Sequence, residues 1–309
     1  MATNLQAPLP DTGIDTDRVA SRGHNLFADL IIGSILLVIS VLVLFPLYDV
    51  LIVSLGAIPG SVWPKTINLS AYSYIIGHSG LIRAFLTSVG VVIVGTAVSL
   101  SLTTVTSYVL SRKYLPGRGV LMAFIVITMF FSGGLVPWYL VVKNLGLINS
   151  YWSLILPSAM NAFYMIIMLT FFREFPVSLE ESAKIDGAND WTILTRIVLP
   201  TSTPVLATIG LFYSVDRWND WFTPMLFLTD PTKWPLQTFT QQLIINASYI
   251  LQTTVGSAGA SSVITGQMPV LPDSLKMAVI VIGMIPIMAV YPFLQKYFTK
   301  GVMIGSIKG

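Results

Sequence analysis

The sequence predicts an all-α membrane protein with six transmembrane helices, and two observations carry this prediction. Of the 309 residues, 54% are hydrophobic and only 10% are charged, with a mean hydropathy of +0.77. Soluble domains carry about 25% charged residues, so most of this surface is expected to face lipid. In addition, six apolar stretches each have about the 20-residue length of a helix that crosses the hydrocarbon core of a bilayer.

These stretches define one transmembrane domain, residues 26–297, between an N-terminal tail, residues 1–25, and a C-terminal tail, residues 298–309. The spans are expected at residues 27–54, 82–110, 119–140, 152–172, 202–229 and 275–297. The N-terminal tail is polar and has no small-residue cleavage site, so we expect the first span to be retained and not to be a signal peptide.

The lysines and arginines between the spans predict the orientation. If the N-terminus is inside, eleven of the 17 lie on the cytoplasmic side and five outside, while Arg217 lies within a span. Because cytoplasmic segments of membrane proteins are enriched in Lys and Arg, both termini and the loop 173–200 are predicted to be cytoplasmic. The loop 230–274 is then external.

Composition excludes several classes of site. There is no cysteine, which excludes disulfides and thiolate chemistry. The two histidines, His24 and His78, are far apart and outside the spans, so no metal site is expected. The net charge of +3 is small, and nucleic acid is not expected as a partner.

Residues 173–200 form a charged loop whose pattern indicates two short helices separated by a turn. Ser178 and Glu181 have the spacing of a capping box, so the first helix is expected to begin there. Gly187 then interrupts the pattern, either as a turn that needs positive φ or as a point of close backbone approach.

The second helix of this loop carries an apolar stripe. Asn189 or Asp190 can cap its N-terminus, and Trp191, Leu194 and Val198 are expected on one face, with Ile193 and Ile197 adjacent. Helices that lie on a membrane surface are usually rich in Lys and Arg, whereas this unit begins with acidic residues. Docking into a groove of a partner protein is therefore the preferred interpretation.

The loop resembles the EAA signature of permease subunits of ABC importers: Glu-Ala-Ala, three residues, Gly, nine residues, Ile, one residue, Leu-Pro. Every position of that pattern matches except the second, where Ser182 replaces alanine. The resemblance implies that this loop is the coupling helix, which seats in a groove of the ATP-binding subunit. It assigns that role to Glu181, Ser182, Ala183, Asp186, Gly187, Ile197, Leu199 and Pro200.

Other segments resemble the carbohydrate-uptake, maltose-permease-like branch, and within it the aldouronate or lipoprotein-type permeases for polysaccharide fragments. These segments are residues 68–72, 131–135, 208–213, 218–219, 291–296 and 301–305. The resemblance implies a type I ABC importer permease fold in a bacterial cytoplasmic membrane. It also implies three kinds of partner: a homologous second permease, an ATPase dimer and an extracytoplasmic solute-binding protein.

The chain contains no Gly-x-x-x-x-Gly-Lys-Ser/Thr phosphate loop. If ATP drives transport, ATP and Mg²⁺ are therefore expected to bind to the ATPase partners. This chain is not expected to be an enzyme or to hold a cofactor.

A polar and aromatic patch lies within the fifth span. Ionisable groups at membrane depth are costly and normally face a cavity or one another. Arg217 either pairs with Asp216 or Asp220 to hold helices together, or the patch lines a sugar path. The candidates for that path are Tyr213, Asp216, Arg217, Trp218, Asn219, Asp220 and Trp221. A catalytic or metal-binding pair of aspartates is not favoured, because no acidic motif in another span would complete it.

The external loop 230–274 is long for a connection and contains a Gly/Ser/Thr-rich stretch, residues 253–266. It is either a flexible insertion or, as in the sugar permeases that the chain resembles, a contact with the binding protein, which we prefer. The predicted function is the permease of an oligosaccharide importer, for neutral or uronate-containing fragments. The alternatives are a permease for another solute class, such as peptides, and an ion-coupled carrier, which the lack of an internal repeat weakens.

Overall fold

The structure, a computed structural model, describes residues 26–57, 61, 63–64, 67–77, 79–256 and 273–289. These residues are mostly helical and contain no strand, which confirms the predicted all-α class. Both tails, the segments 291–296 and 301–305, and residues 257–272 of the external loop lie outside the described residues. The chain divides into two compact units, Met1–Tyr48 and Asp49–Gly309.

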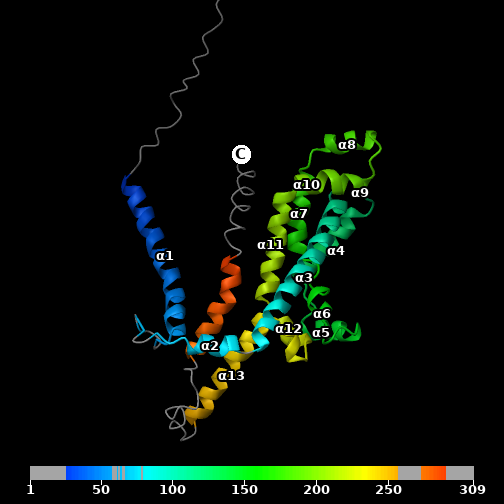
Figure 1. Ribbon diagram of the computed structural model, residues 1–309. Helices are drawn as coiled ribbons and strands as arrows, with labels where there is room; N and C mark the ends of the chain where they lie inside the picture. The colour runs from blue at the N-terminus through cyan, green and yellow to red at the C-terminus, as the bar shows by residue number, and fades with distance from the viewer. Residues whose placement is uncertain are drawn as a thin grey trace, which may run out of the picture. The chain divides into compact units, whose positions relative to one another are not determined.

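The elements follow one another along the chain, and Figure 1 labels α1 to α13 among them. They are α1 (Leu26–Ser54), α2 (Ser70–Gly77), α3 (Ser79–Ser111), α4 (Arg118–Phe130), α5 (Leu135–Asn144), α6 (Trp152–Ile155), α7 (Ala162–Arg173), α8 (Val177–Ile185), α9 (Asp190–Ile193), the π-helix η2 (Leu194–Val198), α10 (Leu199–Thr201), α11 (Thr203–Asn219), α12 (Phe222–Phe227), the 3₁₀-helix η3 (Pro231–Lys233) and α13 (Leu236–Gly256). Residues 273–289 form the last described helix.

The described part of the first unit is α1 up to Tyr48. Within α1, the stretch Asp29–Ser54 has a mean hydropathy of 2.9 over its most apolar window and is long enough to cross a bilayer. The predicted first span is therefore confirmed as one continuous apolar helix, with Pro46 inside it.

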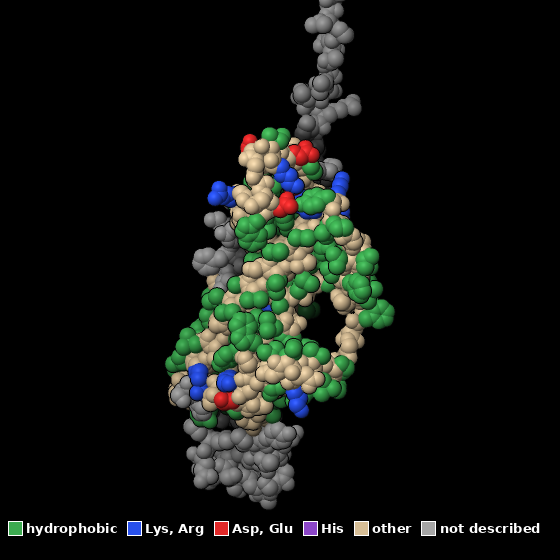
Figure 2. All heavy atoms as spheres, turned by 90° about the vertical axis from the view of Figure 1, so that its right-hand side faces the viewer, with side chains coloured by type: hydrophobic (Ala, Val, Ile, Leu, Met, Phe, Trp, Pro, Cys, Tyr) green, Lys and Arg blue, Asp and Glu red, His purple; other side chains and the backbone are tan. Residues whose placement is uncertain are grey.

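The second unit is built around α3, against which α7 and α11 pack (Figure 1). The core at this meeting contains Met168 and Phe172 of α7 and Ile209 of α11, all almost fully buried. A buried hydrogen bond of 2.7 Å joins the hydroxyls of Thr103 on α3 and Tyr213 on α11. Charged side chains gather at the two ends of the face in Figure 2, with mainly hydrophobic and uncharged surface between them, as a membrane domain requires.

Three predicted spans are not continuous helices. The span expected at 119–140 breaks between α4 and α5, which are bent by 119°. Gly134 adopts φ 81° and ψ 172° at this break, a conformation that favours glycine, and it directly precedes the first residue of α5. The spans expected at 152–172 and 202–229 likewise divide into α6 and α7, and into α11 and α12.

Hydropathy predicted these three spans as single helices because it measures apolar length and not backbone turns. Among the described residues, two helices are long and apolar enough to cross a membrane by themselves. The number reaches five if three sharply bent pairs each count as one span: α4 with α5, α7 with α8, and the stretch Asp190–Thr201 with α11. The predicted sixth span, 275–297, is helical as far as residue 289 and then leaves the described residues.

The external loop expected at 230–274 is partly helical, because η3 and the 21-residue α13 occupy its first half. Leu236 at the start of α13 is buried with Ile75 of α2 and Val279 of the last described helix. Its backbone N–H donates to the hydroxyl of Ser88 on α3 at 2.7 Å. The beginning of this segment is therefore packed against the bundle.

Close packing of α3 on α11 gives a stability prediction. A Cβ placed on Gly95 would lie 2.6 Å from the Nε of Arg217, too close for any real contact. Gly95→Ala is therefore expected to lower the midpoint of thermal unfolding, by the equivalent of about 1–3 kcal/mol for an overpacked core. The matched control is Gly90→Ala on the same helix, where a Cβ meets no atom within 4 Å. Equal midpoints for the two variants would contradict the close contact.

Candidate functional site

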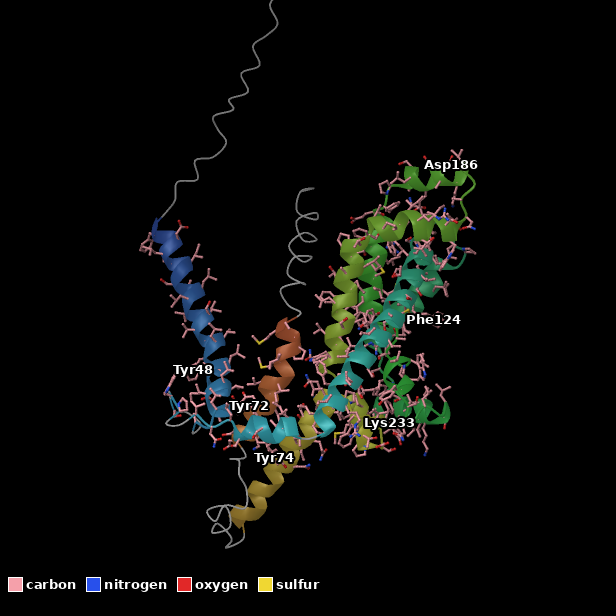
Figure 3. All side chains as sticks on the ribbon, viewed as in Figure 1. Tyr48, Tyr72, Tyr74, Phe124, Asp186 and Lys233 are labelled. Atoms are coloured by element: carbon pink, nitrogen blue, oxygen red, sulfur yellow. The ribbon has the colours of Figure 1, made fainter. Side chains whose placement is uncertain are left out.

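The charged loop 173–200 folds as two helical segments at one end of the bundle. The first is α8, and the second runs continuously through α9, η2 and α10. Asp186 lies at this end and Lys233 near the opposite one (Figure 3). Gly187 between the segments has φ 82°, and a Cβ on it would meet nothing within 4 Å. Of the two roles expected for this glycine, the turn is therefore confirmed.

Of the two helix starts expected in this loop, the first is capped differently from the prediction and the second is capped as predicted. The predicted capping box is wrong, because α8 begins at Val177 with Pro176 in the capping position, and Ser178 already lies inside the helix. The second start is confirmed: the side chain of Asn189 accepts a hydrogen bond from the backbone N–H of Thr192 at 2.8 Å.

The expected apolar stripe of the second segment is wrong at one position. Leu194 and Val198 are buried, but Trp191 is 64% exposed. Ile193 takes its place and is fully buried. In η2 the backbone N–H of Leu199 bonds to the carbonyl of Leu194, five residues back, so residues five apart come onto one face. This π-turn brings Ile193 and Val198 together, which α-helical spacing would not.

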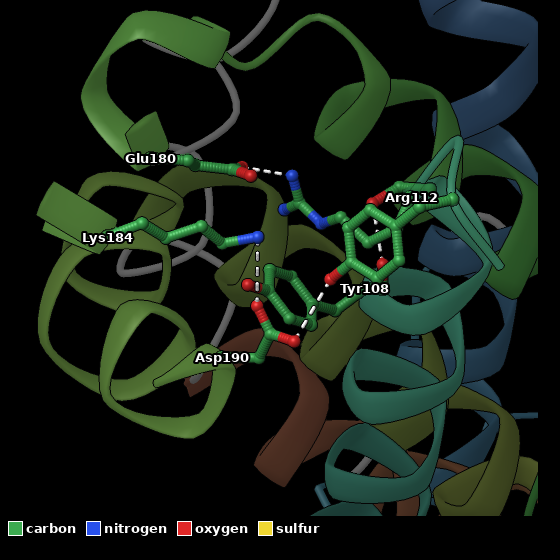
Figure 4. Close-up of polar contacts among 7 residues, drawn as sticks. Tyr108, Arg112, Glu180, Lys184 and Asp190 are labelled. Atoms are coloured by element: carbon green, nitrogen blue, oxygen red, sulfur yellow. Dashed lines mark hydrogen bonds and ion pairs between the residues drawn. The ribbon is translucent and has the colours of Figure 1, made fainter. Parts of the chain in front are cut away.

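A buried ion pair fixes α8 to the end of α3 (Figure 4). The guanidinium of Arg112 pairs with the carboxylate of Glu180, and their side chains are only 11% and 9% exposed. The same guanidinium lies 4.1 Å from the ring centroid of Tyr108 on α3. The sequence did not predict this ion pair. Arg112 was counted there only among the cytoplasmic Lys and Arg residues, and the EAA motif includes Glu181 but not the adjacent Glu180.

A second, more exposed set of contacts joins the α8–α9 turn to the segment after α3 (Figure 4). The hydroxyl of Tyr114 donates to Asp190 at 3.0 Å, and the ammonium group of Lys184 lies 3.4 Å from the same carboxylate. Burial, and then the hydrogen bond to Asp190, raise the pKa of the Tyr114 hydroxyl, so it remains a donor at neutral pH. Lys184 and Asp190 are about half exposed, so their pair contributes little by itself.

The eight residues that carry the motif divide into two groups. Ala183 is buried, and Ile197 and Leu199 pack on the same core, so these three hold the loop on the bundle. The exposed group consists of Glu181, Ser182, Asp186, Gly187 and Pro200.

The same end of the bundle also presents apolar side chains outside the motif. Ile185 is 86% exposed, and Leu179 and Trp191 are exposed as well. Large apolar side chains exposed beside charged ones are typical of a docking surface. The sequence pattern gave no sign of Leu179 and Ile185, because their exposure depends on which face of α8 the bundle covers.

Arg217 of the polar patch holds helices together, but through other partners than expected. Its guanidinium donates to the hydroxyl of Ser99 on α3 at 2.7 Å and to the carbonyl of Leu154 on α6 at 2.9 Å. Within the described part of the chain it forms no ion pair with Asp216 or Asp220, so the predicted pairing is wrong.

The two aspartates have partners of their own. Asp216 accepts a hydrogen bond of 2.7 Å from the hydroxyl of Tyr164 on α7. Asp220, where α11 has ended, accepts a hydrogen bond of 3.0 Å from the backbone N–H of Thr223 in the first turn of α12. Each of these bonds uses one carboxylate oxygen, and the remaining acceptor capacity is open.

The patch does not form one surface. Tyr213, Asp216, Arg217 and Asp220 line a cavity of about 170 Å³ between α3, α6, α11 and α12, here called the acidic pocket. Asn219 and Trp221 line a separate cavity, and Trp218 donates from its indole to the carbonyl of Gly283 at 3.5 Å. Helical spacing had placed the patch on one continuous helix, whereas α11 ends at Asn219.

Comparisons with known proteins identify the family of the chain. Residues 114–304 match the model of the family described as binding-protein-dependent transport system inner membrane component. The chain is 45% identical over 291 residues to the polygalacturonan/rhamnogalacturonan transport system permease protein YtcP of Bacillus subtilis. This alignment covers 92% of this chain and 99% of the relative. It is 46% identical over 249 residues to protein LplC of the same organism, covering 80% of this chain and 81% of the relative.

A solved structure is also similar. It is a bacterial ABC transporter involved in the import of the acidic polysaccharide alginate, with a TM-score of 0.77 and 28% identity, covering 90% of this chain and 99% of the matched one. A family match over residues 114–304, and relatives of this similarity over most of the chain, show that it belongs to the inner membrane components of binding-protein-dependent transport systems, the permeases of ABC transporters.

Proposed function

We propose that this chain is one transmembrane subunit of an ATP-driven importer for oligosaccharides released from polysaccharides, including fragments that contain uronates. The observation that carries this proposal is the presentation of α8: its inner side is fixed to the bundle, while its charged and apolar outer side is free to dock. The names of the Bacillus subtilis relative and of the similar structure support a polysaccharide-derived cargo.

The exposed residues of α8 are the proposed contact with the ATPase. Glu181, Ser182 and Asp186 supply the polar part and Ile185 the apolar part of a helix seated in a groove. ATP and Mg²⁺ are bound by the ATPase dimer, so this chain transmits a movement and performs no hydrolysis. A helix fixed rigidly to α3 passes a push on its outer face to the bundle.

The remaining partners follow from the same assignment. A homologous second permease completes the translocation path, and an extracytoplasmic binding protein delivers the cargo. We place the complex in the bacterial cytoplasmic membrane with both termini and the loop 173–200 inside, as the distribution of Lys and Arg favours. The loop 230–274 then faces the binding protein. The family match does not favour an ion-coupled carrier.

The acidic pocket is the proposed part of the sugar path on this subunit. Because both terminal nitrogens of Arg217 donate to protein oxygens, the groups left to a ligand are mainly the carboxylates of Asp216 and Asp220. Carboxylates accept hydrogen bonds from sugar hydroxyls. This pocket therefore suits the hydroxyl face of a sugar, and the carboxylate of a uronate fits a different part of the path.

Substitutions of the adjacent residues Glu180 and Glu181 test whether the ion pair with Arg112 fixes α8 to the bundle. Glu180→Gln leaves the buried guanidinium of Arg112 without its counter-charge, which costs about 3–5 kcal/mol in a buried ion pair. We expect a lower thermal midpoint and faster proteolysis within residues 173–200. The matched control, Glu181→Gln, changes an exposed side chain and is expected to keep the wild-type midpoint. If both variants unfold like the wild type, α8 is not held by this pair.

The acidic pocket gives a transport prediction. Asp216→Ala removes an acceptor from the pocket, and losing one hydrogen bond to a carboxylate weakens binding by about 1.5–3 kcal/mol, or about tenfold or more. We expect oligosaccharide uptake by the reconstituted complex to fall by this factor, while subunit assembly is unchanged. Val215→Ala, at the neighbouring exposed position, is the control. Wild-type uptake by the Asp216 variant would remove this pocket from the path.

A further inference from the structure

A second cavity, of about 260 Å³, lies beside the end of α11 and has no lining residue in common with the acidic pocket. Its walls come from the turn after α11, the first turns of α13 and the last described helix. The residues that face it are mainly polar on one wall and apolar on the other, and none of them is charged. It is here called the amide pocket.

The polar wall holds three primary amides, those of Asn219, Gln237 and Gln241. None of these amides forms a side-chain hydrogen bond within the described part of the chain. The neighbouring Gln242, which does not line the cavity, differs: its amide donates to Asn246 at 3.0 Å. The three amides on this wall therefore have donors and acceptors available to a ligand.

Local contacts hold this wall in place. The hydroxyl of Thr238 donates to the carbonyl of Trp221 at 3.0 Å, which ties the turn after α11 to α13. Trp221 also packs edge to face on Phe222, with ring centroids 5.8 Å apart. Its indole lines the cavity opposite apolar residues of the last described helix, among them Ile280 and Met284. An aromatic ring and the three amides thus border one space.

The chemistry of this lining selects the kind of ligand. Each primary amide offers two N–H donors and a carbonyl acceptor. Asn219 is exposed, and Gln237 and Gln241 are half-buried, so these groups can reach a ligand in the cavity. A hydrocarbon would leave all three unpaired, and an anion would find no cation in the lining. A ligand with several hydroxyls and an apolar C–H face satisfies both the amides and the indole.

We propose that the amide pocket is a second sugar subsite, which binds one uncharged, hydroxyl-rich pyranose ring of the transported oligosaccharide. The volume agrees with a single ring, because it lies just below the range of about 300–1,000 Å³ usual for larger ligands. The proposal rests on the function proposed above and adds a division between the pockets: carboxylates in one, neutral amides and an indole in the other.

The chain has no cysteine, so a single introduced thiol can probe the pocket. Gln241→Cys is placed in the assembled complex with the second permease, the ATPase dimer and the binding protein, in lipid vesicles. Modification of this thiol by a membrane-impermeant maleimide is measured with and without a mixed rhamnose–galacturonate oligosaccharide. At about ten times its dissociation constant the sugar leaves about a tenth of the sites free, so modification is expected to slow about tenfold.

Gln242→Cys, one residue along α13 and outside the lining, is the control and is expected to react at the same rate with and without sugar. Gln237→Cys, from the same wall, replaces the first variant if that one fails to assemble. Equal rates with and without sugar overturn the proposal. So does a thiol that never reacts, since lipid or the second permease then fills the pocket. If the complex takes up the oligosaccharide but the sugar does not protect the thiol from the maleimide, only this subsite is refuted. If the wild-type complex takes up no oligosaccharide, the proposed function is refuted.

Discussion

The attachment of α8 to α3 is the contact on which the rest of the account depends. A surface helix of nine residues has little stability of its own, because helices this short are marginal in water. The buried pair of Arg112 and Glu180, backed by the ring of Tyr108, gives this helix a fixed orientation. Only a fixed helix can pass a movement of a docked subunit to α3, the longest helix of the bundle. The same pairing leaves the exposed side of α8 free for a partner.

A second arginine is used differently inside the bundle. Arg217 reaches across α3 at Gly95 and binds neutral oxygens of Ser99 and Leu154. It therefore joins α11 to α3 and α6 without using the nearby carboxylates, and these stay available in the acidic pocket. Sugar recognition and helix packing thus use different residues of one short segment. The acidic pocket and the amide pocket share no lining residue, so the two can bind chemically different parts of a ligand.

The sequence predicted the features that depend on local spacing. The residue pattern of the loop predicted both helical segments and gave a turn as one of two roles for Gly187, because a glycine and a capping asparagine act on their immediate neighbours. It failed where tertiary contacts or backbone breaks decide. Hydropathy does not detect the turn at Gly134, and helical spacing cannot be extended past the end of α11. The role of Glu180 depends on Arg112, which is 68 residues away in the chain, and no local pattern reports it.

The central claim is that energy enters through the exposed face of α8, and ATP hydrolysis by the assembled complex tests it most directly. Wild type and Ile185→Glu are compared in vesicles, with the binding protein loaded with oligosaccharide. Placing a charge at this exposed apolar position leaves the fold intact but opposes docking. The account predicts that loaded binding protein stimulates hydrolysis and uptake in the wild type and not in the variant. Equal stimulation of both, or uptake by the wild type without any ATPase, would contradict it.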